Sequence, residues 1–220
     1  MKREIITTSD GSTTIHIPEW NEQYHSKHGA IQEAYHVFIK NGLTLFQNQK
    51  IDVLEIGFGT GLNSFITFIE AEKLGLEVNY VGVEKYPISD DEYNQLNYVD
   101  ELNADDLAAT FKKMHSNSWE EKCILSDNFS LTKRKQDFKD IDDKHVFNLI
   151  YFDAFGARVQ PDLWTVDMFQ KMFDALKSGG VLVTYAAKGS VRRAMIEVGF
   201  KVEKLPGPPG KREMLRAKKE

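Results

Sequence analysis

The sequence has a single cysteine, Cys123, among its 220 residues. One thiol excludes an internal disulfide and a cysteine-based zinc site. The sequence also lacks an apolar run of the roughly 20 residues that a membrane span needs, because Asn148 interrupts the longest one, at 146–152. No apolar stretch follows the charged residues at 2–4, so we expect no secretory signal peptide and a cytoplasmic protein.

Repeats and low-complexity tracts are absent as well. Hydrophobic residues make up 41% of the chain and charged residues 28%, which is typical of a soluble globular protein. This composition excludes a disordered chain, a coiled coil and collagen. A domain of this length buries an adequate core without disulfides or metal ions.

Charge is distributed unevenly along the chain. The net charge of −5 argues against a dedicated nucleic-acid binder. Residues 188–220, however, contain ten Lys or Arg against four Glu, a net charge of +6, so residues 1–187 carry −11. Such a basic segment is either a solvated tail or a face that meets a polyanion.

Strands and helices alternate from residue 51 onward. Strands are expected at 51–56, 78–83, 122–125, 145–152, 179–185, 200–205 and 213–217, with helices at 62–74, 105–116, 166–176 and 190–198. This order predicts an α/β fold with a mostly parallel, seven-stranded sheet. Residues 1–48 predict a β-hairpin around Asp10-Gly11 and a helix at 29–47 that pack on a core formed by residues 49–220.

A glycine-rich loop, Gly57-Phe-Gly-Thr-Gly61, follows the first strand of this core. Its G-x-G-x-G spacing lacks the third glycine of the dinucleotide fingerprint, because position 62 is Leu, and it lacks the Gly-Lys-Ser/Thr of a phosphate-binding loop. A glycine loop that follows a Leu-Glu-Ile strand is more typical of a binding site for S-adenosylmethionine than of one for a dinucleotide or a nucleoside triphosphate. The alternative is a tight structural turn.

Three acidic residues follow expected strands, and the carboxyl ends of parallel strands form the usual ligand-binding edge. Glu84 is placed to accept hydrogen bonds from ribose hydroxyls. Asp127 is placed to accept from an adenine amino group, although a turn before Asn128 explains it equally well. Asp153 follows the most apolar strand and is a candidate to hold and deprotonate an acceptor amine.

Other side chains are weaker candidates for the same edge. Phe155 and Trp164 are candidates to contact a base, although a core position explains Trp164 as well. Lys211 and Arg212 are candidate phosphate contacts or a solvated pair of charges. Glu33 lies on the first expected helix, within reach of the edge. The six histidines show no metal-ligand spacing, so we assign no metal.

Several motifs together resemble one family. These are Ser9-Asp-Gly-Ser12, Gly29-Ala-Ile-Gln-Glu33, Glu55-Ile-Gly-Phe-Gly-Thr-Gly-Leu-Asn63, Asp153-Ala-Phe155, Pro161-Asp-Leu-Trp-Thr165 and Gly210-Lys-Arg-Glu-Met-Leu215. Over nearly the whole chain the sequence resembles the methyltransferase domain of the bifunctional tRNA 5-methylaminomethyl-2-thiouridine biosynthesis proteins, which has stand-alone bacterial relatives.

The resemblance implies a class I, Rossmann-like methyltransferase that uses S-adenosylmethionine. Its acceptor would be the amine of 5-aminomethyl(-2-thio)uridine at the wobble position of tRNA. The residues that match the family's donor site are Glu33, Gly57, Gly59, Gly61, Asn63, Glu84 and Asp127, and Asp153 matches the acid beside the transferred methyl group. The family's second, FAD-dependent domain finds no counterpart before Glu220, so we expect a separate FAD-dependent or aminomethyl-forming enzyme upstream.

Three alternatives stay open. One is a class I methyltransferase that acts on another RNA or on a small amine. Another is an aminopropyltransferase of the polyamine-synthase type, although the Gly-Gly-Gly-Asp-Gly loop of that family is missing. The last is a non-catalytic module that binds S-adenosylmethionine or RNA, which the intact glycine loop, Glu84 and Asp153 disfavour.

Overall fold

Two β-sheets organise the chain, for which a computed structural model describes residues 2–220. The large sheet has eight strands in the order β10-β11-β9-β8-β4-β5-β7-β6, and the small one has the order β1-β2-β3. The strands are β1 (Glu4–Thr7), β2 (Thr13–Ile17), β3 (Glu22–Gln23), β4 (Lys50–Ile56), β5 (Glu77–Val83), β6 (Lys122–Ser126), β7 (Phe129–Arg134), β8 (Phe147–Phe152), β9 (Leu176–Thr184), β10 (Lys201–Pro206) and β11 (Glu213–Lys218).

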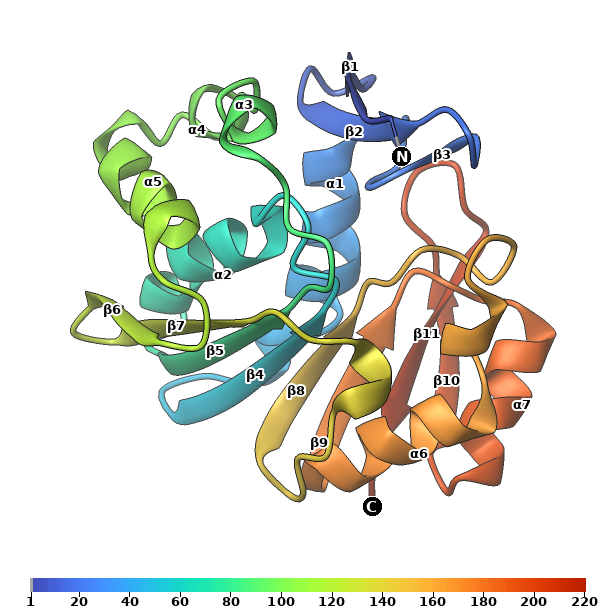
Figure 1. The fold of residues 1–220 in the computed structure, drawn as a ribbon. Coiled ribbons are helices and arrows are strands. Elements are labelled where there is room, and N and C mark those ends of the chain that lie inside the picture. Colours follow the sequence, from blue (N-terminus) through green and yellow to red (C-terminus); the bar gives the residue numbers. More distant parts are fainter. Residues whose placement is uncertain (1) are drawn as a thin grey trace.

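Helices cover both faces of the large sheet (Figure 1). They are α1 (Ala30–Ala34), α2 (Leu62–Lys73), α3 (Asp90–Tyr93), α4 (Tyr98–Glu101), α5 (Ala108–Ser116), α6 (Val166–Ala175) and α7 (Gly189–Glu197). Alternate residues of β8 show how the layers form: Leu149 and Tyr151 pack with α1, α2 and α5, whereas Ile150 and Phe152 pack with α6 and α7. Strand β8 is therefore buried on both sides, as is typical of the inner strands of a parallel sheet.

The parallel strands end together at one edge. Ile56 of β4 is in register with Val83 of β5 and with Phe152 of β8. Gly57 follows β4, and Glu84 and Asp153 follow the strands on either side of it, so all three residues lie at the same carboxyl edge. The small sheet β1–β3 lies above this edge (Figure 1). No helix within residues 2–220 has both the length and the apolar character to cross a bilayer.

The structure corrects three expectations. The large sheet has eight strands instead of seven, because β7 was missed; it is β7 that pairs parallel with β5. The expected strand at 122–125 is β6, which pairs antiparallel with β7 at the edge of the sheet. The helix expected at 29–47 is divided into α1, a π-helical segment at Tyr35–Lys40 and a 3₁₀ turn at Leu43–Leu45. Gly42 precedes the 3₁₀ turn, where a Cβ would lie 2.5 Å from the Phe38 carbonyl oxygen.

Candidate active site

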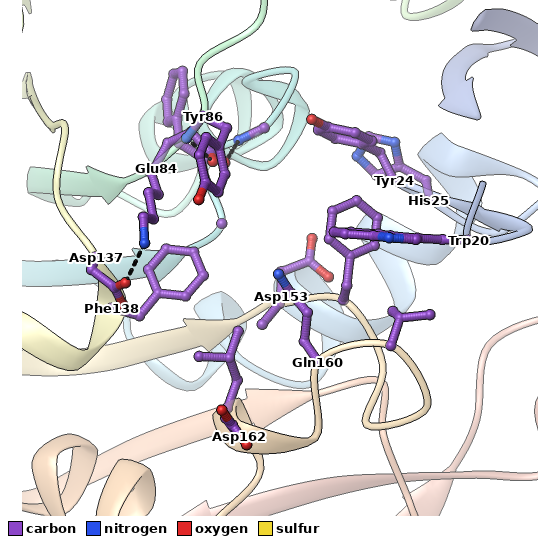
Figure 2. Close-up of a pocket in the computed structure, with 18 of the residues that line it drawn as sticks. Trp20, Tyr24, His25, Glu84, Tyr86, Asp137, Phe138, Asp153, Gln160 and Asp162 are labelled. Carbon is purple, nitrogen blue, oxygen red and sulfur yellow. Dashed lines mark hydrogen bonds and ion pairs between the residues drawn. The ribbon is translucent and has the colours of Figure 1, made fainter. Parts of the chain in front are cut away.

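A cavity of about 330 Å³ opens at the carboxyl edge of the large sheet. Glu84, Tyr86, Asp137 and Phe138 lie on one side, and Trp20, Tyr24 and His25 lie on the opposite side, with Asp153 between them (Figure 2). The structure thus brings together the expected residues Gly57, Gly59, Asn63, Glu84, Asp153 and Phe155. A cavity of this volume is in the range of small-molecule binding sites.

The glycine loop forms the floor of this cavity. Gly57 and Gly59 have φ values of 92° and 51°, which a residue with a Cβ adopts only under strain. A Cβ on Gly57 would also lie 2.8 Å from the Asp153 carbonyl oxygen, and one on Gly59 would lie 3.0 Å from the Tyr24 ring. Gly61 does not line the cavity; it begins α2 with φ 73°, and its Cβ position faces His115.

Glu84 is held by backbone groups at the end of β5. The Gly59 N–H donates to Oε2 at 3.2 Å, and the Tyr86 N–H donates to Oε1 at 2.8 Å. Burial raises the pKa of this carboxyl, and the two N–H groups oppose that rise because they favour the charged form. Each oxygen keeps a lone pair that can accept from a ligand hydroxyl.

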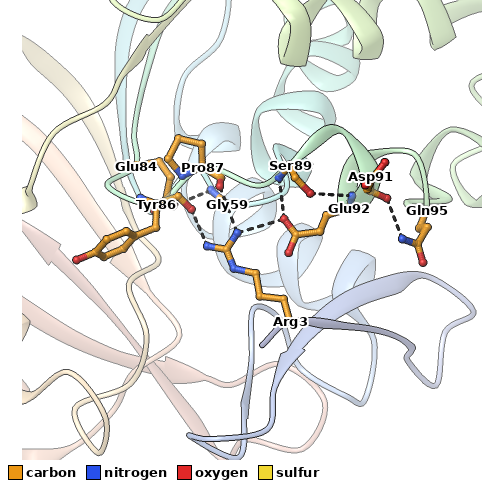
Figure 3. Close-up of polar contacts among 9 residues, drawn as sticks. All are labelled: Arg3, Gly59, Glu84, Tyr86, Pro87, Ser89, Asp91, Glu92 and Gln95. Carbon is orange, nitrogen blue, oxygen red and sulfur yellow. Dashed lines mark hydrogen bonds and ion pairs between the residues drawn. The ribbon is translucent and has the colours of Figure 1, made fainter. Parts of the chain in front are cut away.

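Arg3 fastens the N-terminal segment to the loop after Glu84 (Figure 3). Its guanidinium donates to the carbonyl oxygens of Tyr86, at 2.7 Å, and of Pro87, at 3.2 Å. It also pairs with the Glu92 carboxylate at 3.2 Å, and only 13% of its side chain is exposed. This contact spans more than 80 residues of sequence and joins the two sides of the cavity.

Asp153 belongs to a chain of buried polar groups. The Asn63 side-chain amide donates to Asp153 Oδ2 at 2.8 Å and to Glu55 Oε1 at 2.9 Å. Glu55 is fully buried in β4, and its Oε2 has no hydrogen-bond partner in the structure of residues 2–220. Burial raises the pKa of both carboxyls well above the usual range; the Glu33 carboxylate raises that of Asp153 further.

Aromatic residues from the N-terminal segment form the opposite side. The Phe155 ring meets Trp20 and Tyr24 edge-on, with centroids 5.4 and 5.1 Å apart. The His25 Nδ1 lies 3.0 Å from the Thr14 hydroxyl, and burial lowers the pKa of His25 to about 4. His25 is therefore neutral near pH 7. The sequence pattern gives no sign of this side of the cavity, because its residues precede the core in the chain.

The expected role of Asp127 is wrong. The turn between β6 and β7 lies beside the start of β5, since the Val78 N–H donates to the Asn128 carbonyl at 2.8 Å. Asp127 is therefore exposed at the amino edge of the sheet, opposite the cavity. Its place is taken by Asp137 and Phe138, which follow β7 at the carboxyl edge and line the cavity. Recognising β7 as the third parallel strand would have identified them.

Glu33 and Lys211 lie in a second cavity instead of the first. This cavity, of about 360 Å³, shares Tyr24, His25 and Phe155 with its neighbour. Lys211 forms an ion pair with Glu33, and only a third of its side chain is exposed. Glu33, expected at the donor site, therefore lies beside the lining of the donor cavity, and Lys211, expected to contact phosphate, is paired with Glu33 in the free protein.

Trp164 and Arg212 differ in their surroundings. Trp164 is 5% exposed, packs on Phe152, and donates from Nε1 to the Phe155 carbonyl at 2.8 Å. Base stacking by Trp164 is therefore wrong, and the residue instead supports the loop that carries Phe155. Arg212 is exposed and lines an open groove with Arg158 and Lys188.

Much of the C-terminal basic segment is neutralised locally. Three of its cations pair with acids of the same segment: Lys201 with Glu220, Lys204 with Glu213, and Arg216 with Glu203. Lys219 is 6% exposed and donates to the carbonyl oxygens of Phe173 in α6 and of Leu176 at the start of β9. Across residues 2–220, no ion pair involves Lys188, Arg192, Arg193, Arg212 or Lys218, so these five cations of the segment keep their positive charge.

Known proteins are similar to this chain in sequence and in structure. A family model described as S-adenosyl-L-methionine-dependent methyltransferase matches residues 110–220. The tRNA 5-methylaminomethyl-2-thiouridine biosynthesis bifunctional protein MnmC of Delftia acidovorans is 30% identical over 99% of this chain, and that of Hydrogenovibrio crunogenus is 27% identical over 89%. These alignments cover 35% and 31% of the relatives, so the chain spans about a third of their length.

A solved structure shows the same fold. The crystal structure of MnmC2 from Aquifex aeolicus superposes with a TM-score of 0.80 over all of this chain and 70% of that one, at 23% identity. The family model matches the C-terminal half of the chain, and the fold with its glycine loop at the carboxyl edge is consistent with that match. The chain belongs to the family of S-adenosyl-L-methionine-dependent methyltransferases.

Proposed function

We propose that this enzyme methylates the primary amine of 5-aminomethyl(-2-thio)uridine at the wobble position of tRNA, in the cytoplasm. The names of the relatives support this acceptor over another RNA, a small amine or aminopropyl transfer. The observation that carries the proposal is the position of Asp153. Its carboxyl lines the first cavity, and its pKa responds to the charges of Glu33 and Lys211 in the second cavity.

The first cavity fits S-adenosylmethionine in the chemistry of its lining. The free lone pairs of Glu84 are suited to the ribose hydroxyls, and Asp137 beside the Phe138 ring is suited to an adenine with its amino group. We assign Gly57 and Gly59 to backbone contacts with the donor and Asn63 to its polar end. Gly61 contributes only by starting α2.

When bound, S-adenosylmethionine supplies a methyl group whose C–S bond breaks as the amine nitrogen forms the new N–C bond. Asp153 orients the amine and takes the proton that its ammonium form must lose before the lone pair is available. The raised pKa of Asp153 makes it a stronger base than an exposed carboxylate. Asn63 fixes the carboxyl by its 2.8 Å hydrogen bond.

For the tRNA backbone we propose the face that carries Lys188, Arg192, Arg193 and Arg212. These cations have no ion pair within the described residues, and two of them, Lys188 and Arg212, line the groove beside the second cavity. Contacts between cations and phosphates position a nucleic acid and weaken as salt rises. The wobble base, turned out of its loop, would then enter between this face and the N-terminal segment.

The test is transfer of labelled methyl from S-adenosylmethionine to tRNA from a strain that lacks this activity, followed by nucleoside mass analysis. We expect 5-aminomethyl-2-thiouridine to disappear and its methylaminomethyl form to accumulate. Asp153→Asn should lower turnover by about 10²–10⁴-fold, because it removes the proton acceptor, while donor affinity stays within a few-fold. An inert tRNA with intact donor binding would refute the acceptor.

The matched control is Asp127→Asn, at the opposite edge of the sheet. It should leave turnover and donor affinity unchanged, because Asp127 is exposed and remote from both cavities. If Asp153→Asn lowered donor affinity in proportion to turnover, its carboxyl would act on the donor and the assigned role would fail.

A further inference from the structure

The second cavity is built from parts of the chain that are distant in sequence. Residues 22–28 form one wall, Glu33 of α1 a second, and Tyr185 after β9 with Lys211 of the β10–β11 loop a third. Ala154 and Phe155 separate it from the donor cavity, which Tyr24 and His25 also border. A molecule in this cavity would therefore lie close to the Asp153 carboxyl, whose pKa responds to the charges of both Glu33 and Lys211.

An ammonium group already occupies this cavity. The Lys211 Nζ pairs with Glu33 and lies 3.9 Å from the centroid of the Tyr185 ring. Glu33 is 7% exposed, and its other oxygen accepts the Ser26 N–H at 2.7 Å. The Tyr185 hydroxyl donates to the Ala154 carbonyl at 2.8 Å, which fixes the ring. A buried carboxylate and an aromatic face together form a binding site for a primary ammonium.

We propose that this cavity is the acceptor subsite, in which Glu33 and the Tyr185 ring bind the ammonium of a 5-aminomethylated pyrimidine after displacing Lys211. The inference rests on the proposed function and names the residues that recognise the substrate. Both oxygens of Glu33 are engaged in the free protein, so an incoming ammonium competes with Lys211 directly. Lys211 follows the Pro206–Gly210 turn, at the mouth of the groove that carries Arg212.

Because of this competition, removal of the Lys211 side chain and removal of the Arg212 side chain should change the KM for tRNA in opposite directions. A cation that contacts phosphate helps the tRNA to bind, so its removal raises KM. A cation that occupies the ammonium site hinders binding, so its removal lowers KM. Arg212 is exposed and belongs to the first class, whereas the side chain of Lys211 turns inward to Glu33 and belongs to the second.

The first experiment measures kcat and KM for tRNA carrying 5-aminomethyl-2-thiouridine at saturating S-adenosylmethionine. We expect Lys211→Met to lower KM several-fold, Arg212→Met to raise it, and Glu33→Gln to raise it at least tenfold. Affinity for S-adenosylhomocysteine should be unchanged in all three. A rise in KM for Lys211→Met would overturn the displacement, and an unchanged KM for Glu33→Gln would overturn the subsite.

A matched pair of variants tests whether the Tyr185 ring contributes to ammonium binding. Tyr185→Phe keeps the ring face and loses the hydroxyl, whereas Tyr185→Leu loses the face; only the second should raise KM several-fold. Equal KM values for the two variants would exclude the ring from ammonium binding. The pair also serves if Glu33→Gln does not fold.

A binding measurement separates this inference from the proposed function. The nucleoside 5-aminomethyluridine is titrated by calorimetry into protein saturated with S-adenosylhomocysteine, with uridine as the control. We expect binding of the amine only, weakened at least tenfold in Glu33→Gln. If the protein binds the nucleoside but leaves tRNA inert, the tRNA acceptor fails and the subsite stands. If tRNA is methylated and Glu33→Gln binds the nucleoside as well as wild type does, the subsite fails alone.

Discussion

Replacing Glu55 by Gln should change how stability depends on pH. Glu55 lies in β4 with no exposed surface, one oxygen accepts from Asn63 at 2.9 Å, and the other has no partner within residues 2–220. Burial raises the pKa of this carboxyl well above its usual value of 4.5. Gln keeps the carbonyl oxygen that Asn63 needs and removes the ionisation.

The sign and the size follow from proton linkage. A raised pKa means that the folded protein keeps a proton that the unfolded chain loses above pH 4.5. The contribution of Glu55 to stability is therefore fully present below that pH and is lost as pH rises to the folded pKa. In that window the free energy of unfolding of wild type should fall, relative to Glu55→Gln, by about 1.4 kcal/mol per pH unit. For a chain of this size that is about 3–6 °C in Tm.

The assay is denaturant unfolding of both proteins at pH 5.5 and 6.5. Glu72→Gln, an exposed position in α2, is the control and should parallel wild type. The difference between Glu55→Gln and wild type should widen with pH. A difference that stays constant would mean that Glu55 ionises in the folded state as it does in the unfolded one, and would refute the reasoning from burial.

Three further predictions concern the donor cavity and its supports. Arg3→Ala removes hydrogen bonds to the loop after Glu84; it should lower the free energy of unfolding by about 1–2 kcal/mol and weaken donor binding, whereas Lys2→Ala should do neither, as chemical unfolding and calorimetry would show. Phe138→Ala should weaken S-adenosylhomocysteine by about 1–3 kcal/mol if the ring packs on adenine, and unchanged calorimetric affinity would exclude that contact. Asp137→Asn should lower the affinity for the donor several-fold, whereas Asp127→Asn should leave it unchanged. Equal affinities of the two variants in a titration would contradict the assignment of Asp137, in place of Asp127, to the donor cavity.

The core of the fold was predictable because its strands are short apolar runs that end in glycine or acid. The strand that was missed, β7, has a cation at an inward position. Lys133 is 1% exposed, its ammonium donates to the His115 carbonyl at 2.6 Å, and it lies 4.9 Å from the Trp119 ring centroid. A pattern of apolar residues does not reveal a buried lysine that is satisfied by distant partners. Because β7 was not expected, Asp127 was predicted to be the acid at the end of the third parallel strand, whereas Asp137 follows that strand.

The site was predictable where a side chain follows a strand, as Glu84 and Asp153 do, because parallel strands end together. It was not predictable where packing across the sequence decides. Lys211 and Glu33 are 178 residues apart, and neither shows in its local sequence that the other neutralises it. The side formed by Trp20, Tyr24 and His25 depends likewise on how β1–β3 sit over the sheet.

Among the buried titratable groups around the two cavities, Asp153 is the best suited to accept the proton of the amine. Burial lowers the pKa of His25 to about 4, so its weakly basic ring is a poor base near neutral pH. Burial also raises the pKa of the Tyr24 and Tyr185 hydroxyls, which therefore stay protonated. Glu33 is engaged by an ammonium in either state of the second cavity.

Asp153 is different, because burial and Glu33 raise its pKa toward that of an amine while Asn63 holds it in place. Replacing Glu33 by Gln should consequently lower the pKa of Asp153 and move the rising limb of the kcat profile to lower pH. A limb that stays in place would show that another group takes the proton.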